Sequence, residues 1–209
     1  MVKVAIFGAT GKSGSRIQAE LLSRGHEVIA IARDPSKMKP AERLTVRQGE
    51  ADGDLAQLIE GADVVVNAYA PPWEHVQALV TFTQRLVDAV KQTGVKRLLM
   101  VGGAGGLKQH AGTEERVIDA PWFPEEWKPI AQAHIDALQV LRGSDINWTT
   151  LTPPGYFEPG ERTGKFRLDT DTMVATEAGA RISMEDYAIA LADEIERSQY
   201  ERQRFTVGY

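Results

Sequence analysis

The sequence contains no cysteine, which excludes a disulfide framework, an iron–sulfur cluster and a zinc site built on thiolates. Its four histidines do not lie at the close spacings of metal ligands, so we expect no metal site. No stretch approaches the roughly 18 consecutive apolar residues that a membrane span needs, and no basic leader precedes an apolar segment. These absences predict a cytoplasmic protein that does not bind membranes.

The chain has 209 residues, of which 43% are hydrophobic and 25% charged, a composition typical of a folded globular domain. Its formal net charge is −5, and the basic and acidic residues are spread along the whole chain. A nucleic-acid-binding surface would need a concentrated basic face, so nucleic acid is not an expected partner. We expect a single domain over residues 1–209.

Short apolar runs alternate with longer amphipathic segments. The runs are rich in β-branched residues and almost continuously apolar, as in parallel strands that are buried on both faces. They lie at residues 2–7, 27–32, 44–49, 63–70, 96–103 and 146–154. Helices are predicted at residues 13–24, 54–60, 73–93, 128–142 and 184–198. The alternation predicts an α/β fold, a Rossmann-type doubly wound parallel sheet with helices on both faces.

Residues 155–209 alternate less regularly and are expected to form a small C-terminal elaboration of the same domain, on the substrate side. The last strand-like run is RFTVGY, at residues 204–209. We expect this strand to be exposed, where it would be able to pair with the sheet of a second copy. A monomer and a homodimer are both compatible with the sequence.

Three glycines, at positions 8, 11 and 14, form the motif GATGKSG between the first strand and the first helix. In this context Gly8 permits the tight turn, Gly11 lets backbone N–H groups approach a pyrophosphate, and Gly14 allows the helix to pack closely on the strand. The free N–H groups of a helix N-terminus favour an anion at this point. The motif therefore predicts a bound dinucleotide.

Basic side chains lie where the choice between NAD and NADP is made. An acidic residue at the end of the second strand would accept hydrogen bonds from a ribose 2′-OH, but this sequence has Arg33 there and Lys12 in the glycine loop. These two cations suit a 2′-phosphate, so we predict NADP in preference to NAD. Asp34, followed by Pro35, is a common helix start.

Several motifs together resemble those of the NADH-flavin reductases. These belong to the NAD(P)-binding atypical short-chain dehydrogenase/reductase group, which also includes biliverdin reductase B and the NmrA-like proteins. The motifs are GATGKSG, ARDPSKM, QGEADGD, VVNAYAPP, KRLLMVGGAGGL, TPPGYFEPGERTGKFRL and ISMEDYAIALADEIE. The resemblance covers nearly the whole chain. It implies a Rossmann domain that binds NAD(P)H and reduces flavins or similar acceptors.

The resemblance also implies which residues contact the cofactor, all of them at carboxyl ends of strands. It assigns the pyrophosphate to Gly8, Thr10, Gly11, Lys12, Ser13 and Gly14. It places the 2′-phosphate near Arg33 and the adenine against Asp52 and Gly53. The remaining cofactor contacts are assigned to Ala68, Tyr69, Ala70, Gly102, Gly103, Pro153, Pro154 and Gly155.

The usual proton donor of short-chain dehydrogenases, a Tyr-x-x-x-Lys pair, does not occur in the sequence. Carbonyl reduction needs such a donor, whereas reduction of a flavin or quinone depends mainly on stacking and orientation. The candidate catalytic residues are His134 and Tyr156. His134 lies on the apolar stripe of its helix, which is also the pattern of a packed core residue. Biliverdin reductase B is similar in having a histidine on this helix.

Six aromatic residues fall in or beside loops that follow strand ends. Trp73, Trp122, Phe123 and Phe157 are the predicted lining of a flat substrate pocket, with Trp127 and Tyr156 nearby in the sequence. Packing under a lid or in a dimer contact is the alternative. Residues 104–127 form a long segment rich in glycine and proline, which is typical of a substrate lid.

These observations predict an NADPH-dependent oxidoreductase that transfers a hydride to a flavin, a quinone or a similar flat dye. Flavin would be a small-molecule substrate rather than a bound cofactor, because a chain of this size has no room for a second, flavin-binding domain. An NAD(P)-binding redox sensor of the NmrA type, without turnover, is the alternative. A sugar-nucleotide epimerase is less favoured, since such enzymes use the missing tyrosine.

Overall fold

The computed structural model describes residues 1–209 with the exception of the Lys37 side chain. It contains an eight-stranded sheet in the order β3-β2-β1-β4-β5-β6-β10-β8, in which only the β8–β10 pair is antiparallel. The strands are β1 (Lys3–Phe7), β2 (Glu27–Ala32), β3 (Leu44–Gln48), β4 (Val64–Asn67), β5 (Arg97–Val101), β6 (Trp148–Thr152), β8 (Arg167–Asp169) and β10 (Gln203–Gly208). Two short strands, β7 (Tyr156–Glu158) and β9 (Arg181–Ser183), pair outside this sheet. This topology confirms the predicted Rossmann-type fold.

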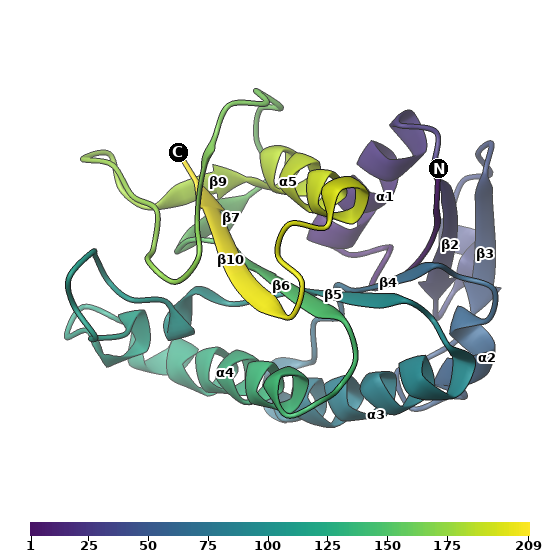
Figure 1. The fold of residues 1–209 in the computed structure, drawn as a ribbon, viewed down its shortest axis with the longest axis horizontal. Coiled ribbons are helices and arrows are strands. Elements are labelled where there is room, and N and C mark those ends of the chain that lie inside the picture. Colours follow the sequence, from purple (N-terminus) through teal and green to yellow (C-terminus); the bar gives the residue numbers. More distant parts are fainter.

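Helices cover both faces of the sheet (Figure 1). On one face lie α1 (Lys12–Ser23) and α5 (Met184–Arg197), and on the other lie α2 (Leu55–Ile59), α3 (Ala78–Thr93) and α4 (Lys128–Arg142). The connections contain 3-10 turns, which are η1 (Pro35–Lys37), η2 (Trp73–His75), η3 (Ala104–Gly106), η4 (Val117–Asp119) and η5 (Glu125–Trp127). The result is a three-layer α/β/α sandwich.

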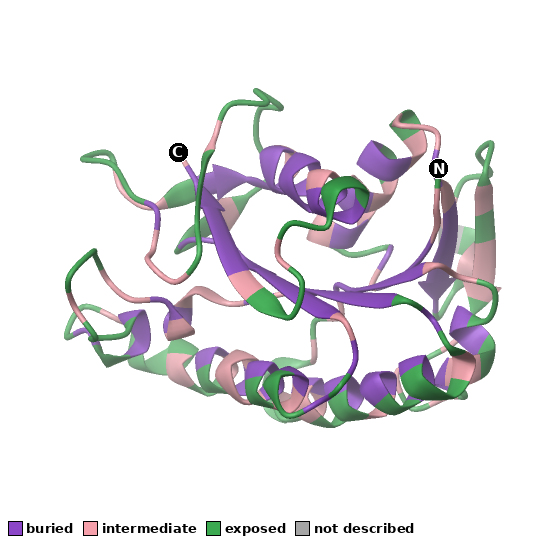
Figure 2. Cartoon of the chain, viewed as in Figure 1, coloured by how far each residue is buried: buried purple, intermediate pink, exposed green. Residues whose placement is uncertain are grey.

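Each strand contributes to two separate apolar cores because successive side chains point to opposite faces. In β1, Val4 and Ile6 belong to the core under α1 and α5, whereas Ala5 and Phe7 belong to the core over α2, α3 and α4. The central strands are therefore buried along almost their whole length (Figure 2). This double burial explains why the strands read as continuous apolar runs.

Charged side chains tie α5 to the rest of the molecule. Arg24, the C-cap of α1, contacts Asp193 at 2.7 Å, and Arg16 of α1 contacts Glu185 at 2.5 Å. Deeper in the fold, Arg97 of β5 forms an ion pair with Glu194 of α5, with side chains only 4% and 2% exposed. The Arg97 guanidinium also donates to Thr149 Oγ1 at 2.6 Å and to Ser198 Oγ at 2.8 Å, which helps to offset the cost of burying its charge.

One helix boundary differs from the sequence-based expectation, and part of one predicted loop is packed into the protein. The helix expected at residues 73–93 begins only at Ala78, because Pro71 and Pro72 enforce an extended backbone and a 3-10 turn follows them. The segment 104–127, expected to be a lid, is packed into the protein at Leu107 and Val117, which are at most 1% exposed. The Val117 N–H donates to the Leu107 carbonyl at 2.8 Å.

The expectation of an exposed final strand is wrong. β10 lies inside the sheet between β6 and β8, with its Phe205, Thr206 and Val207 buried. The Thr206 hydroxyl donates to the Thr152 carbonyl at 2.7 Å across to β6. The short strand β8 occupies the edge instead. Among the described residues, no helix is both long and apolar enough to cross a bilayer.

Candidate functional site

The glycine loop joins β1 to α1 with almost no free space around it. Gly8 has φ +77°, and a Cβ atom there would lie 2.3 Å from the Ala68 carbonyl oxygen. A Cβ atom on Gly14 would lie 2.1 Å from the Gly8 carbonyl oxygen. Only glycine fits either position, because the obstructing atoms belong to the backbone. The predicted roles of Gly8 in the turn and of Gly14 in close packing follow from these contacts.

Gly11 leaves the N-terminus of α1 open to a ligand. It is the N-cap of the helix, its N–H donates to the Gly8 carbonyl at 2.9 Å, and it offers no side-chain cap. The next N–H groups, those of Lys12, Ser13 and Gly14, belong to the first turn, where helical partners do not exist. These donors and the positive end of the helix dipole face the carboxyl edge of the sheet, which suits an anionic group.

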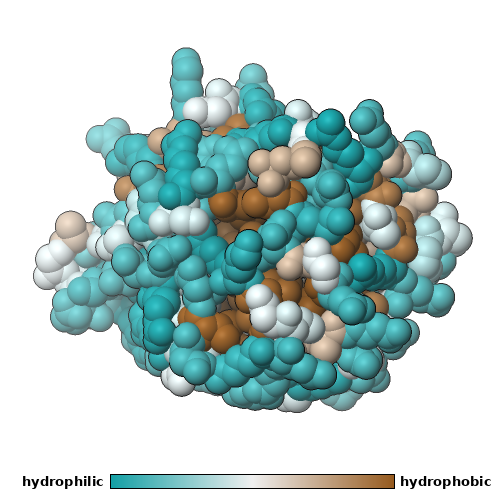
Figure 3. All heavy atoms as spheres, turned by 45° about the vertical axis from the view of Figure 1, so that its right-hand side comes forward, coloured by the Kyte–Doolittle hydropathy of each residue, from teal (hydrophilic) through white to brown (hydrophobic). Residues whose placement is uncertain are grey.

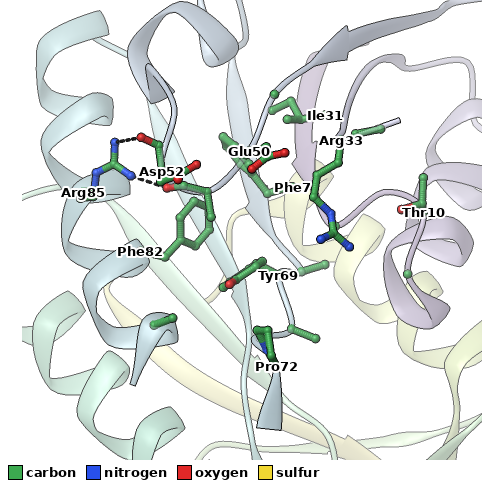
Figure 4. A pocket seen from close by; sticks show the side chains of 18 of the residues that line it. Phe7, Thr10, Ile31, Arg33, Glu50, Asp52, Tyr69, Pro72, Phe82 and Arg85 are labelled. Atoms are coloured by element: carbon green, nitrogen blue, oxygen red, sulfur yellow. Dashed lines mark hydrogen bonds between the residues drawn. The ribbon is translucent and has the colours of Figure 1, made fainter. Parts of the chain in front are cut away.

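A cavity of about 590 Å³ lies next to this loop at the carboxyl ends of β1 to β4 (Figure 4). It brings together predicted cofactor contacts from four separate loops, namely Gly8, Thr10, Gly11, Arg33, Asp52, Ala68, Tyr69 and Ala70. On the face shown in Figure 3, apolar atoms are visible at the base of hollows in a largely hydrophilic surface. The cavity has the place and size of a nucleotide site in an open α/β sheet.

Three aromatic rings form one wall of the cavity. Phe82 of α3 lies edge-on to Phe7 with ring centroids 5.1 Å apart, and it contacts Tyr69 at 4.9 Å. The buried Asn67 side chain accepts a hydrogen bond from the Tyr69 N–H at 3.1 Å, which fixes the turn after β4. This wall offers a flat apolar surface to a ring such as adenine.

The cavity mouth carries a guanidinium group. The exposed Arg33 side chain extends between Glu50 and Thr10 in Figure 4. Asp34 has a structural role, because its carboxylate accepts from the Ser36 N–H at 3.1 Å and caps η1. Arg33 therefore lines the cavity, whereas Asp34 caps the turn that follows, as the Asp-Pro pattern predicts.

Arg85 of α3 supports the loop after β3 and was not expected from the sequence. Its Nη1 donates to the Ala51 carbonyl, and its Nη2 donates to the carbonyls of Asp52 at 3.1 Å and Gly53 at 2.6 Å. One planar guanidinium thus holds three consecutive carbonyls. Figure 4 shows Arg85 beside this loop, with the bonds to Ala51 and Asp52 drawn as dashed lines. The side chain of Arg85 thus stabilises the loop that the resemblance assigns to adenine.

A second, much smaller crevice lies beside the ends of β5 and β6. Its walls are Gly102, Gly103, Gly106, His134, Ile135, Leu138, Thr150, Thr152 and Arg204. A Cβ atom on Gly103 would lie 2.8 Å from the His134 ring, and one on Gly102 would lie 2.6 Å from Thr152 Oγ1. These two glycines are thus required by the packing of α4 and β6, independently of any ligand.

His134, the candidate catalytic histidine, is held without charge. Burial lowers the pKa of the imidazole to about 4. Among the described residues its Nδ1 is buried and has no hydrogen-bond partner, and the same holds for the Thr150 hydroxyl in this crevice. A neutral imidazole at neutral pH is a poor general acid, so the geometry favours the packed-residue interpretation of His134.

The other predicted residues near β6 lie apart from the large cavity. Pro153 and Pro154 are buried directly after β6, and Gly155 is exposed. Tyr156 is 70% exposed on β7, where its N–H donates to the Ala180 carbonyl at 3.0 Å. Its hydroxyl has no role in the described hydrogen bonds, so catalysis by Tyr156 stays a prediction.

The expected aromatic pocket is divided into three ring pairs. Trp73 packs edge-on against Trp127 with ring centroids 5.3 Å apart, and Trp122 lies beside its neighbour Phe123 at 6.5 Å. Phe157 contacts the buried Tyr187 at 4.7 Å and joins the core under α5. The structure thus gives Phe157 a packing role and leaves the exposed indoles as the aromatic surface near the site.

Several residues lining the large cavity were missed by sequence reasoning. They are Phe7, Ile31, Ala32, Gly49, Glu50, Ala51, Pro72, Ala78, Thr81, Phe82 and Arg85. Most of them lie at or just after the carboxyl ends of strands, and this position in the sequence could have identified them. Those on α3 carried no signal, because the apolar side of an amphipathic helix is expected to face the core. Within the described side chains, no cluster of three or more His, Asp or Glu residues could hold a metal ion.

Comparison with known proteins agrees with this geometry. A family model of NAD(P)H-binding proteins matches residues 8–197. The Bacillus subtilis protein YwnB, of uncharacterised function, is 38% identical over 211 residues, which cover 99% of this chain and 98% of YwnB.

Two solved structures share the fold over their full length. A Burkholderia pseudomallei protein described as exported is 40% identical, with a TM-score of 0.89 and 100% of both chains covered. A Streptococcus pneumoniae protein assigned as an NADH-flavin reductase is 31% identical, with a TM-score of 0.89 and coverage of 100% and 99%. The predicted resemblance is confirmed, whereas a cytoplasmic location stays a prediction.

Proposed function

The chain belongs to the NAD(P)H-binding family, an oxidoreductase-type family of atypical short-chain dehydrogenases/reductases, and on this premise we propose that it is an NADPH-dependent reductase of flat acceptors. The acceptor would be a flavin, a quinone or a similar dye. Flavin is a substrate in this proposal and not a resident cofactor.

The observation that carries the proposal is the cavity beside the glycine loop with Arg33 at its mouth. The N–H groups of Lys12, Ser13 and Gly14 would hold the pyrophosphate, since no side chain caps this helix end. The ring wall of Tyr69 would lie against the nucleotide. Arg33, an always-charged donor, supports the choice of a 2′-phosphate over a 2′-hydroxyl.

The absence of a Tyr-x-x-x-Lys pair supports an acceptor that needs little help with protons. A bound nicotinamide supplies a hydride, that is, one proton with two electrons. The chain contributes orientation, by fixing the glycine loop and the turn at Tyr69. The His134 imidazole is neutral and its Nδ1 is buried, so the second proton that a flavin or quinone takes up would come from water.

The test is a comparison of coenzymes with one charge variant and its control. NADPH or NADH is mixed with riboflavin, FMN or a quinone, and loss of reduced-nicotinamide absorbance is followed. Arg33→Ala is expected to raise the KM for NADPH about tenfold and to leave NADH nearly unchanged, because one exposed charge-assisted contact is lost. Arg142→Ala removes the same charge from an exposed site at the far end of α4 and serves as the control. Equal coenzyme preference before and after Arg33→Ala would refute the 2′-phosphate assignment.

A binding role without turnover is the second candidate, favoured by the neutral state of His134 and the missing tyrosine pair. Such a protein would sense the ratio of oxidised to reduced coenzyme. The same assay separates the two candidates. Tight NADPH binding with no acceptor-dependent oxidation would support the sensor and refute the reductase.

A further inference from the structure

We propose that the acceptor binds against the paired indoles of Trp73 and Trp127, and that it is a neutral or cationic ring system rather than a phosphate-bearing flavin. This inference rests on the proposed reductase function and narrows its substrate class. Three observations carry it: the exposure of the ring pair, its place next to the cavity, and the charge around it.

The two indoles present an unusual apolar surface. Their planes are nearly perpendicular, at 87°, and their centroids are 5.3 Å apart. Trp73 is 57% exposed and Trp127 is 51% exposed. Each ring thus packs against the other while much of its surface faces solvent. A corner made of two aromatic surfaces is suited to a flat ring that stacks on one indole and meets the other edge-on.

The corner adjoins the large cavity. Trp73 follows Pro72, which lines the cavity, and η2 leads directly into α3, whose Ala78 and Thr81 also line it. Trp127 is the N-cap of α4, and His134 lies about two turns further along that helix, in the small crevice against Gly103. The pair therefore joins the loop after β4 to the start of α4, on the ligand-binding edge of the sheet.

The charge next to both rings is negative. Glu74 follows Trp73, and Glu126 precedes Trp127, and both are exposed. Among the ion pairs of the described side chains, neither glutamate has a cationic partner. The nearby Lys128 is already neutralised by its contact with Glu125.

A terminal phosphate would therefore approach two uncompensated carboxylates. Like charges repel over the Debye length, which is about 30 Å at 0.01 M salt. A neutral ring meets no such penalty, and a cationic ring is attracted. The acidic neighbours thus select by charge, while the indoles select by shape.

The reaction balances for both favoured acceptor types. For a quinone, NADPH delivers a hydride, water supplies one proton, and the products are the hydroquinone and NADP⁺. For a cationic dye of the phenazinium or thiazinium type, the hydride alone forms the neutral reduced dye. In both cases NADPH is oxidised by two electrons and the acceptor gains the same two electrons.

Riboflavin and FMN provide a matched test, because they share one isoalloxazine ring and differ by a phosphate. At 0.01 M salt, kcat/KM with NADPH is expected to be at least about threefold higher for riboflavin than for FMN. The difference is expected to shrink at 1 M salt, where the Debye length is about 3 Å. The double variant Glu74→Gln/Glu126→Gln is expected to bring FMN close to riboflavin. Glu42→Gln/Glu60→Gln makes the same change of charge at exposed positions on other loops and serves as control.

The ring pair is tested with Trp73→Ala and Trp73→Phe. The alanine variant is expected to raise the acceptor KM about tenfold with the Kd for NADPH unchanged, and phenylalanine is expected to restore most of the loss. FMN turnover equal to that of riboflavin at low salt would overturn the inference and leave the reductase function standing. Failure of every acceptor to oxidise NADPH would overturn both. If Trp73→Ala instead converts a dimer to a monomer without changing acceptor KM, the pair is a subunit contact and the inference is wrong.

Discussion

Replacing Arg85 by methionine removes a guanidinium and keeps a side chain of similar length. The change leaves the consecutive carbonyls of Ala51, Asp52 and Gly53 without the donor that they share. The loop then samples several conformations in the free protein. Binding of the adenine half of the coenzyme then has to order the loop again, so the affinity for the coenzyme falls. The effect is indirect, because all three described bonds of Arg85 go to the loop.

The magnitude follows from the exposure of the bonds. Arg85 is half-buried and Asp52 is exposed, so each hydrogen bond contributes toward the lower end of the usual range, about 0.5 to 1 kcal/mol. Three bonds together are worth about 2 kcal/mol, which corresponds to an increase in the Kd for NADPH of up to about 30-fold. Arg85→Lys keeps the charge but lacks the planar fork, and we expect it to recover only a small part.

Calorimetric titration with NADPH and with 2′,5′-ADP measures both effects. The two ligands share the adenine half, so Arg85→Met is expected to weaken them equally, with kcat nearly unchanged. Urea unfolding of the free variant shows how much of the loss is a change in overall stability. Two results would refute the reasoning: an unchanged Kd in the methionine variant, or full recovery in Arg85→Lys, which would mean that charge alone matters.

Three further predictions concern stability and protonation. Gly14→Ala places a Cβ 2.1 Å from the Gly8 carbonyl oxygen, so we expect a loss of about 2 to 3 kcal/mol in urea unfolding; an unchanged midpoint contradicts it. The pKa of His134, about 4, lies below its usual value of 6.5, because burial disfavours the charged imidazolium. The contribution of the neutral imidazole to the free energy of unfolding is therefore complete above pH 6.5 and is lost as the pH falls toward 4. An NMR titration midpoint near 6.5 would contradict this prediction. Arg97→Met leaves the buried Glu194 carboxylate without its partner and is expected to lower the free energy of unfolding by about 3 to 5 kcal/mol in thermal or urea unfolding. The double variant Arg97→Met/Glu194→Met is expected to recover much of this loss. A loss in the double variant equal to the sum of the two single losses would contradict the prediction.

The strands were predictable because burial on both faces leaves a strong mark on the sequence. β1 has apolar residues facing two cores, so alternation is absent and the run is continuous. The glycine loop was equally readable, since backbone contacts at Gly8 and Gly14 tolerate no other residue. The helix predicted at residues 54–60 is present as α2, and the structure shows that the Asp54 carboxylate caps it by accepting from the Gln57 N–H at 3.1 Å.

The parts that failed depend on contacts between distant segments. Arg85 donates to main-chain carbonyls, and a carbonyl has no signature in a sequence. Phe82 was missed because it belongs to the buried face of α3, and no local pattern shows that this face also lines the cavity. The aromatic residues were grouped by their loops, yet Phe157 turns to the core at Tyr187. Such choices are decided by how loops pack, which local patterns do not encode.

Because α1 packs against α5, the two helices that cover one face of the sheet come from opposite parts of the chain. During synthesis, α2, α3 and α4 emerge together with the strands that they cover, so one core can close early. The other face, with Ile6 and Leu151, is covered only in part, by α1, until α5 has left the ribosome. Contacts over such a separation form slowly, and an open apolar sheet invites association. The growing chain therefore carries an incompletely covered apolar face until α5 docks, and the contacts of Arg16 with Glu185 and of Arg24 with Asp193 join α5 to the first helix of the chain.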